Sequence, residues 1–226
     1  MTIDSIKYKA CIFDLDGTVL DSMGVWRRVD EIFLGRRNLP LTDEYCKAIS
    51  SMKLNLAADY TVKLFKLKED PKDIIGEWLD LAREEFTYHI QPKPFAVEYI
   101  SKLRELKIPM AVATTSQKEL YLPALKRLNI YGYFDAVADS ETVSFGKDRP
   151  DIFLTAAKML NTEPKDCIVF EDTIHGLSSA ARAGFITVGF LDENHPESHA
   201  EIMKIADCTA CDFKEFYETL CEKACT

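Results

Sequence analysis

The sequence predicts an α/β fold: a three-layer core built on a mostly parallel sheet, with an all-helical domain inserted into it. Short apolar, β-branched runs alternate with stretches of helical periodicity, the pattern of strands joined by crossover helices. The interval between the first two such runs is far longer than one crossover requires. The 226 residues, 47% of them apolar, are enough to bury one good core and a small second lobe.

Six segments have the length and composition of buried strands. In chain order they are "KACIFD", "PMAVATT", "DAVAD", "DCIVFED", "FITVGF" and "ADCTAC", at residues 9–14, 109–115, 135–139, 166–172, 185–190 and 206–211. Each is short and rich in apolar or β-branched residues, and helical stretches separate them. This arrangement favours parallel pairing with helices covering both faces of the sheet.

The long interval between the first and second strands contains several helical stretches and no convincing strand. Examples are "TDEYCKAISSM", "LNLAADYTVKLFKL" and "PKDIIGEWLDLAREEFTYH". We therefore predict a helical domain over residues 23–92, entered near Asp21 to Met23 and left through the stiff segment "QPKP" at 91–94. Residues 1–22 and 93–226 are then predicted to form the core.

Charge and hydropathy exclude several classes of partner. The chain carries 28 Lys and Arg against 37 Asp and Glu, a net charge of −9, and the basic residues are scattered. This charge repels nucleic acid and anionic membranes, so we expect neither as a partner. No stretch approaches about 18 consecutive apolar residues, and "MTIDSIKYKA" has no apolar signal-peptide core. We expect a cytoplasmic protein that is a monomer or weak dimer.

Seven cysteines, an odd number, favour a reducing compartment over a disulfide framework. Those near the C-terminus allow two interpretations. Cys208, Cys211, Cys221 and Cys225 could be four thiolate ligands of a zinc ion. Free cysteine is, however, usually a small buried apolar residue, and Cys221 and Cys225 fall at i, i+4 on one face of a predicted helix. We favour the second interpretation.

Polar side chains gather where the predicted strands end. The set comprises Asp14 and Asp16 after the first strand, Thr114, Thr115 and Ser116 after the second, Glu171 and Asp172 after "CIVF", and Lys147 in the loop "SFGKDRPD". The carboxyl ends of parallel strands share one edge of a sheet, where ligands bind. Acids this close repel one another unless a divalent cation holds them, and oxygen ligands suit Mg²⁺. The hydroxyls and the lysine suit a phosphate beside that ion.

Taken singly, these motifs also have ordinary structural explanations. An acid after a strand is most often a turn former or a helix N-cap, and Asp172 followed by "TIHGLSSAARAG" fits an N-cap. "ATTS" before a helix is likewise an ordinary capping sequence, and a loop lysine such as Lys147 is usually a solvated charge. The joint pattern is what indicates a site.

The same residues carry a family resemblance. "DLDGTVLDS" resembles the first signature of the haloacid dehalogenase-like superfamily in its phosphatase pattern, Asp-x-Asp-x-Thr. Thr114 in "VATTS" resembles the second signature, Lys147 the third and "VFEDT" the fourth, in the expected order. The resemblance implies a Rossmann-like core. The helical insert is similar to the cap of the subfamily that includes β-phosphoglucomutase and many small-metabolite phosphatases.

The resemblance also implies roles for individual residues. Asp14 would be the nucleophile that forms an aspartyl-phosphate, and Asp16 the general acid and then the base. Mg²⁺ would be held by Asp14, the backbone carbonyl of Asp16 and Asp172, with Glu171 in support. Thr114, Thr115 and Lys147 would hold the phosphoryl oxygens. The implied activity is Mg²⁺-dependent hydrolysis of a small phosphorylated metabolite; a sugar-phosphate mutase and a phospho-dependent binding protein without turnover stay open as alternatives.

The chain departs from the family pattern at three places. Asp148 in "KDRPD" replaces the first proline of the frequent Lys-Pro-x-Pro, and Phe95 stands where a glycine is common. In the mutase a histidine follows the first signature, whereas this chain has "MGVWRR", which counts against mutase activity. Trp26 there either closes over an organic substrate or is a buried cap residue. The candidates for setting substrate specificity are Trp26, Arg27, Met52 and Lys53.

Overall fold

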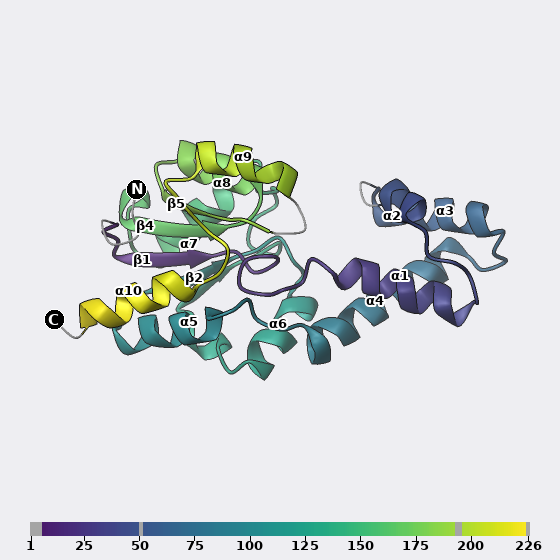
Figure 1. The fold of residues 1–226 in the computed structure, drawn as a ribbon, viewed down its shortest axis with the longest axis horizontal. Helices are drawn as coiled ribbons and strands as arrows, with labels where there is room; N and C mark the ends of the chain where they lie inside the picture. Colours follow the sequence, from purple (N-terminus) through teal and green to yellow (C-terminus); the bar gives the residue numbers. More distant parts are fainter. Residues whose placement is uncertain (1–5, 50–51, 193–195, 225–226) are drawn as a thin grey trace. The chain divides into compact units, whose positions relative to one another are not determined.

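The computed structural model describes residues 6–49, 52–192 and 196–224. The chain divides into two compact units, drawn in Figure 1. Residues 1–22 and 91–226 form the first, here called the core unit, and residues 23–90 form the second, called the helical unit. Each unit has its own buried interior.

A six-stranded sheet forms the centre of the core unit. Its strands are β1 (Ala10–Phe13), β2 (Met110–Ala113), β3 (Ala136–Ala138), β4 (Cys167–Glu171), β5 (Ile186–Phe190) and β6 (Cys208–Ala210). They lie in the order β3-β2-β1-β4-β5-β6, and every pairing of neighbours is parallel. The six predicted strands are confirmed. The sheet is wholly parallel rather than mostly parallel, as expected for short apolar strands covered on both faces.

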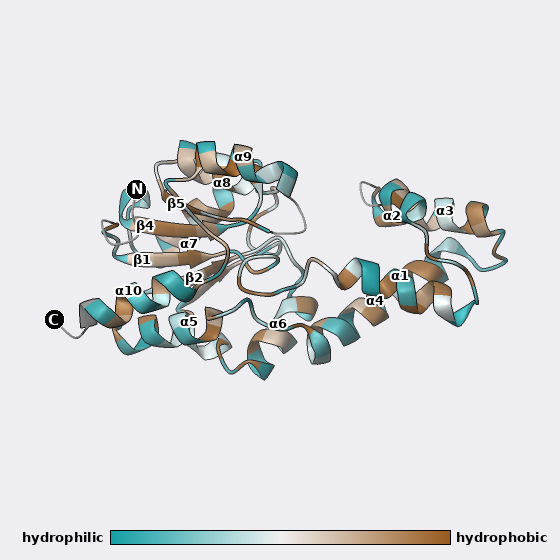
Figure 2. Cartoon of the chain, viewed as in Figure 1, coloured by the Kyte–Doolittle hydropathy of each residue, from teal (hydrophilic) through white to brown (hydrophobic). Residues whose placement is uncertain are grey.

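Helices cover both faces of this sheet. In chain order they are α5 (Ala96–Glu105), α6 (Lys118–Arg127), α7 (Asp151–Met159), α8 (Ile174–Arg182), α9 (Pro196–Ile205) and α10 (Lys214–Ala224). The sheet separates α8 and α9 from α5 and α10 in Figure 1. The strands lie toward the hydrophobic end of the colour scale in Figure 2. Across the described residues, no helix is both long enough and apolar enough to cross a membrane.

The two faces of the sheet are packed by different kinds of side chain. Small and branched residues such as Ala10 and Ile12 pack against Phe153 and Ala156 of α7 on one face. On the other face the aromatic rings of Phe13 and Phe170 stack at 4.9 Å. These two residues are paired across β1 and β4 in the register of the sheet. Successive side chains of a strand point to opposite faces of the sheet, so β1 contributes Ile12 to one layer and Phe13 to the other. Packing on both faces holds β1 in the middle of the core.

The aromatic layer also fixes the helices that cover it. Tyr99 of α5 packs edge-on against Phe13, at 6.3 Å, and lies 5.5 Å from Phe213, which immediately precedes α10. Phe216 of α10 packs edge-on against Phe170 at 5.2 Å. Large buried rings on this face therefore hold β1 and β4, the two strands that end in the candidate acids.

The helical unit contains α1 (Val25–Arg36), α2 (Asp43–Ile49), α3 (Leu54–Phe65) and α4 (Pro71–Glu84), which continues as a π-helical turn over Glu85–His89. Its described residues form no strand, as predicted. Asp70 caps α4 by accepting from the backbone N–H of Lys72, with proline at the first helical position. The rings of Phe33 and Trp78 meet edge-on at 5.5 Å, joining α1 to α4.

The boundary at the end of the helical unit differs by two residues from the predicted one. The core unit resumes at Gln91, not at residue 93. The backbone N–H of Asp21 donates to the carbonyl of Gln91 at 2.8 Å, and that of Lys93 donates to Val19 at 2.9 Å. These hydrogen bonds pair the outgoing and returning segments within the core unit, which a reading of sequence patterns alone does not reveal.

Phe95, which replaces a common glycine, has φ +61°, in the left-handed region, and immediately precedes α5. Glycine reaches this region without steric cost, whereas a side chain makes it unfavourable. The Phe95 ring lies 5.9 Å from that of Tyr217 on α10. The Phe95 ring therefore packs against α10, while the backbone of Phe95 adopts a conformation that is unfavourable for a residue with a side chain.

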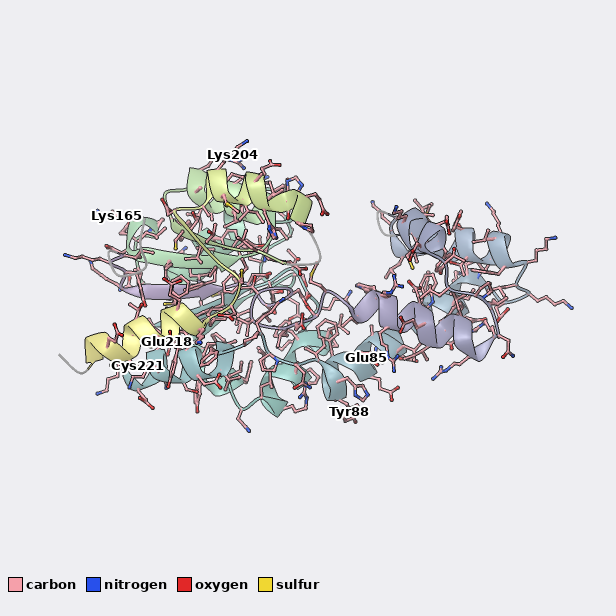
Figure 3. All side chains as sticks on the ribbon, viewed as in Figure 1. Glu85, Tyr88, Lys165, Lys204, Glu218 and Cys221 are labelled. Atoms are coloured by element: carbon pink, nitrogen blue, oxygen red, sulfur yellow. The ribbon has the colours of Figure 1, made fainter. Side chains whose placement is uncertain are left out.

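The described cysteines are distributed between the interior and the surface. Cys11 and Cys167 are buried in β1 and β4, Cys211 is exposed, and Cys208 and Cys221 are half-buried. Figure 3 labels Cys221 on α10. In the part of the chain that the structure describes, the group of side chains able to share a metal ion contains acids and no cysteine. Cys225, the fourth residue of the possible zinc set, lies outside the described residues.

Candidate active site

The first part of the site is the turn that follows β1. Asp14 is almost fully buried, and its backbone N–H donates to the carbonyl of Phe170 at 2.9 Å, which continues the pairing with β4. Gly17 then adopts φ +77°. Its N–H donates to Leu20 and the N–H of Leu20 donates to Leu15, which closes a tight loop. A positive φ at this point explains why glycine directly follows the two acids.

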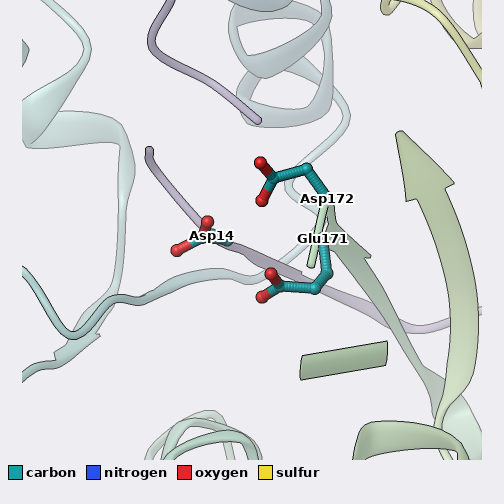
Figure 4. A group of neighbouring side chains, drawn as sticks. All are labelled: Asp14, Glu171 and Asp172. Carbon is teal, nitrogen blue, oxygen red and sulfur yellow. The ribbon is translucent and has the colours of Figure 1, made fainter. Parts of the chain in front are cut away.

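Three carboxylates from two neighbouring strands meet beside this turn. Asp14, Glu171 and Asp172 each have an oxygen within 4.8 Å of the others'. Figure 4 shows the side chains of Glu171 and Asp172 directed toward that of Asp14. Glu171 is fully buried and Asp14 is 4% exposed. The order of the sheet, with β4 beside β1, brings together acids that lie more than 150 residues apart in the chain.

Lys147 joins two of these acids. Its ammonium contacts Asp14 Oδ1 and lies 2.7 Å from Glu171 Oε2, and its side chain is 10% exposed. Burial alone would lower the pKa of Lys147, but the adjacent carboxylates of Asp14 and Glu171 outweigh burial, so the pKa is raised. Lys147 is therefore a cation under the conditions in which its neighbours carry charge.

Glu171 is held on both oxygens. Oε2 accepts from Lys147, and Oε1 accepts from the backbone N–H of Thr173 at 2.9 Å and from its hydroxyl at 2.6 Å. A Cβ at Gly176 would lie 2.5 Å from Glu171 Cδ, so α8 approaches the carboxylate closely only because residue 176 is glycine. Glu171 thus holds Lys147 in place. The contributions of Thr173 and Gly176 were not anticipated from the sequence, although a glycine near the start of a helix was a visible signal.

The expectation that Asp172 could be the N-cap of α8 is wrong. Thr173 is the N-cap, and its hydroxyl accepts from the backbone N–H of Gly176 at 3.2 Å. This leaves the Asp172 carboxylate outside the cap, within 3.5 Å of the Thr18 hydroxyl. The Asp172 carboxylate therefore belongs to the acid cluster and does not cap α8.

The electrostatics of the cluster are compatible with a bound cation in addition to Lys147. Burial, with smaller contributions from neighbouring acids, raises the pKa of Asp14 well above its ordinary value, and Lys147 opposes this. Burial and the nearby Glu171 raise the pKa of Asp172 to about 7. Carboxylates that hold protons so tightly are destabilised as anions, and a bound divalent cation would relieve this. The donors are oxygens, so the residues present fit a hard cation such as Mg²⁺.

Asp16 is held by two hydroxyl groups. Ser22 Oγ donates to Asp16 Oδ1 at 2.7 Å, and Ser116 Oγ donates to Asp16 Oδ2. Ser22 is buried and ends the segment that leads into the helical unit, whereas Ser116 follows β2. Sequence reasoning grouped Ser116 with the strand-end hydroxyls but missed Ser22. Its place at the end of "DLDGTVLDS" was the only signal.

The hydroxyls after β2 have distinct positions. Thr114 is buried, and its Oγ1 accepts from the backbone N–H of Ser116 at 3.1 Å, while Thr115 is exposed. The alternative that "ATTS" caps the next helix is wrong, because Gln117 is the N-cap residue of α6 and no side-chain hydrogen bond caps it. The Thr114 hydroxyl instead shapes the turn that directs Ser116 toward Asp16.

The specificity candidates lie in the helical unit. Trp26 on α1 is 45% exposed, so the alternative of a buried cap tryptophan is wrong. Arg27 pairs with Glu31 and Asp43, at 3.6 Å in each case. Met52 is half-buried and Lys53 is exposed, just ahead of α3.

The fold and this arrangement of residues match a known family. The family model for haloacid dehalogenase-like hydrolases matches residues 8–184, which include all four signatures. The chain belongs to the haloacid dehalogenase-like hydrolase family. This confirms the resemblance seen in the four signatures, and it identifies the chain as an enzyme of a hydrolase family.

Relatives of this hydrolase family include named phosphatases. The fructose-1-phosphate phosphatase YqaB of Escherichia coli is 30% identical over 182 residues, which are 80% of this chain and 96% of that protein. The β-phosphoglucomutase of Bacillus subtilis is 27% identical over 193 residues, 80% of this chain and 82% of that protein. A crystal structure from Thermotoga maritima, provisionally assigned as a β-phosphoglucomutase, superposes with a TM-score of 0.84 at 24% identity, covering 95% and 99% of the two chains. The last likeness shows the shared fold.

Proposed function

We propose that this chain is a Mg²⁺-dependent phosphomonoester hydrolase that acts on a small phosphorylated carbohydrate through an aspartyl-phosphate intermediate. The observation that carries the proposal is the buried cluster of Asp14, Glu171 and Asp172, bridged by Lys147 at the carboxyl edge of the sheet. A family phosphatase related over 80% of the chain supports the substrate class. In this proposal the helical unit is the cap, and the location is cytoplasmic.

In the proposed reaction the Asp14 carboxylate attacks phosphorus, and the bond between phosphorus and the leaving oxygen breaks. Asp16 donates a proton to that oxygen, then takes a proton from the water that hydrolyses the aspartyl-phosphate. Leu15 separates the two acids in the chain, and the hydroxyls of Ser22 and Ser116 hold the carboxylate of Asp16. These contacts give the two acids separate environments, as their separate roles require.

Lys147 and the strand-end hydroxyls would offset the charge on the transferring phosphoryl group. The ammonium of Lys147 already contacts the nucleophile, so a phosphoryl group on Asp14 would lie beside it. Thr114 would contribute its hydroxyl, with Thr115 beside it. Mg²⁺ would be held by Asp14, the backbone carbonyl of Asp16 and Asp172, and would supply electrostatic stabilisation of the phosphoryl oxygens. Glu171, whose oxygens are both occupied, supports Lys147 instead.

A phosphate-release assay tests the proposal. The purified chain is incubated with Mg²⁺ and a panel of phosphorylated sugars, polyols, nucleotides and glycolate-type acids. Asp14→Asn should abolish release, because an amide cannot form the acyl-phosphate. Asp166→Asn is the matched control, since Asp166 forms an exposed ion pair with Lys9, away from the cluster. Substantial activity in the Asp14→Asn variant would remove Asp14 from its role.

The mutase and binding alternatives are separated in the same preparation. β-Glucose 1-phosphate primed with the 1,6-bisphosphate should yield phosphate or no reaction, and little glucose 6-phosphate, because Trp26 stands near the place of the mutase histidine. A coupled assay for glucose 6-phosphate is run beside the phosphate assay. Isomerisation that outpaces phosphate release would establish a mutase. Tight binding of a phosphorylated ligand without turnover would establish a binding protein.

A further inference from the structure

We propose that Arg149 is a positioning residue for Lys147, and that its contacts with Phe145 and Asp151 replace the first proline common in the third signature of the family. The inference rests on the proposed function only for the role of Lys147. The term lysine loop is used here for residues 144–150, which precede α7.

The position of Lys147 demands an ordered loop. Its ammonium must reach Asp14 at the end of β1 and Glu171 at the end of β4 together. Among the described residues, the lysine loop contains one internal backbone hydrogen bond, from Arg149 N–H to the carbonyl of Gly146, at 3.3 Å. Asp148 follows the lysine where a proline is common, so the chain lacks a ring that would restrict the backbone there. Side-chain contacts must supply the missing restraint.

Arg149 makes contacts on both sides of the lysine. Its Nε and Nη2 donate to the two carboxylate oxygens of Asp151, at 3.0 and 3.2 Å. The guanidinium carbon also lies 3.7 Å from the centre of the Phe145 ring. One planar side chain therefore joins a residue two positions before Lys147 to a residue four positions after it, which closes the lysine loop.

A further contact ties the lysine loop to the core unit. Arg182, at the end of α8, donates from Nη2 to the backbone carbonyl of Asp148 at 3.2 Å. α8 also carries Gly176, the residue that lets this helix approach Glu171. The residue after Lys147 and the carboxylate that Lys147 contacts are thus both held from α8. Arg149 joins the loop to itself at Phe145 and to the first residue of α7, so its contacts complement the one from Arg182.

The physical form of these contacts suits positioning more than overall stability. Exposed ion pairs add little to the stability of a whole protein, and the Arg149 side chain is 51% exposed. The two hydrogen bonds from Arg149 to the Asp151 carboxylate, together with the Phe145 ring against the guanidinium, do however restrict the positions of these side chains. Lysine has neither the fork nor the planar face, so Arg149→Lys should not replace Arg149 fully.

The experiment is a double-mutant cycle with Arg149→Ala, Asp151→Ala and the double variant in the full chain. Hydrogen exchange of residues 144–150 is measured without ligand, and inhibition by inorganic phosphate and kcat/KM are measured with Mg²⁺. Arg149→Ala should speed loop exchange and weaken phosphate inhibition by about fivefold to tenfold, the size expected for losing one cation–π contact and one forked pair. The double variant should lose little more than Arg149→Ala alone, since Asp151→Ala removes only the forked pair, which Arg149→Ala also removes.

Arg104→Ala is the matched control. Its side chain is 50% exposed and paired with Asp135 at 3.2 Å, and Asp135 immediately precedes β3 at the opposite end of the strands. This variant should leave loop exchange and phosphate inhibition unchanged while altering the melting temperature no less than Arg149→Ala. Unchanged loop exchange in Arg149→Ala would overturn the proposal. So would additive losses in the cycle, because Arg149 would then act independently of Asp151. An inactive wild type would reject the proposed function, while the exchange data would still test the loop.

Discussion

The carboxylate of Asp16 accepts one hydroxyl hydrogen bond on each oxygen, from Ser22 and from Ser116. The two serines come from segments almost 100 residues apart in the chain, so both hydrogen bonds form only in the folded core unit. A general acid must direct its proton at one oxygen of the substrate, and two fixed donors restrict rotation of the carboxyl group. At the residue scale, these serines are expected to orient Asp16.

Ser22→Ala is predicted to slow hydrolysis of alkyl phosphates by about tenfold, less than the roughly 100-fold or more that general acid catalysis contributes, because Ser116 still holds Asp16. Hydrolysis of p-nitrophenyl phosphate should change far less, because nitrophenolate leaves without a proton. The measurement is the ratio of kcat/KM for the two substrates. Ser22→Thr keeps the hydroxyl and should preserve the ratio. Equal losses on both substrates would show that Ser22 does not act through the general acid.

Gly176→Ala tests the close approach of α8 to Glu171. The added methyl group would meet the Glu171 side chain at 2.5 to 2.7 Å, so the carboxylate or α8 must shift, which would disturb the contact with Lys147. We expect kcat/KM to fall by about tenfold or more, as a displaced catalytic neighbour commonly causes. Gly76→Ala is the control, since a Cβ at that helical position meets nothing within 4 Å. It should stabilise α4 slightly because alanine favours helix by about 0.5–1 kcal/mol over glycine.

At the scale of elements, three helices of the helical unit share a buried polar chain. Asp30 of α1, Tyr45 of α2 and Thr61 of α3 are all buried. The hydroxyls of Tyr45 and Thr61 lie 3.0 Å apart, Thr61 donates to the carbonyl of Ala57 at 2.8 Å, and Asp30 Oδ1 lies 3.5 Å from the Tyr45 hydroxyl. The Tyr45 hydroxyl donates to Asp30 Oδ1 and also lies beside the Thr61 hydroxyl, so Tyr45 links α1 to α3 through buried polar contacts.

Burial raises the pKa of Asp30 to about 6, and the Tyr45 hydrogen bond opposes this only in part. The folded state therefore binds this proton more tightly than the unfolded state. Its contribution to stability is greatest below about pH 4, decreases as pH rises toward 6, and is least above pH 6, where the buried carboxylate is charged in the folded state.

Asp30→Asn is predicted to be more stable than the wild type above pH 6, because the amide is neutral and its oxygen can still accept from the Tyr45 hydroxyl. The gain should be a few degrees in melting temperature, since about 1 kcal/mol corresponds to about 2–4 °C in a chain of this size. Melting curves between pH 4 and 8 provide the measurement, and the difference between the proteins should shrink toward pH 4. A difference that does not vary with pH would contradict the titration of Asp30.

At the scale of the whole molecule, the proposed Mg²⁺ would reduce the repulsion among the three clustered acids, which Lys147 offsets only in part. Mg²⁺ should therefore raise the melting temperature at pH 7.5, by about 5 °C or more at saturation, as expected when a ligand binds the folded state alone. Asp172→Asn should shift the midpoint of this effect to higher Mg²⁺. Excess Ca²⁺ should stabilise the wild type yet inhibit turnover, because its looser coordination fails to hold the in-line geometry. Full activity after treatment with EDTA would reject the metal assignment.

Local patterns in the sequence were sufficient for the elements and for the family signatures, whose residues stay proposals for the site. All six strands, the helical insert and the four signatures could be recognised because periodicity and motif spacing are properties of neighbouring residues. The lysine loop shows where that reasoning stops: a missing proline at Asp148 was visible, but the contacts of Arg149 with Phe145 and Asp151 were not.

The sequence by itself determined which residue types stand at the strand ends. Only the tertiary structure decided which of them touch. Sheet order places β4 beside β1, so Lys147 reaches Asp14 and Glu171 at once, and the turn at Gly17 together with Ser22 orients Asp16. The physical reason is that strand formation depends on local composition, whereas contacts between distant residues depend on how the strands are ordered and how helices such as α8 pack against them.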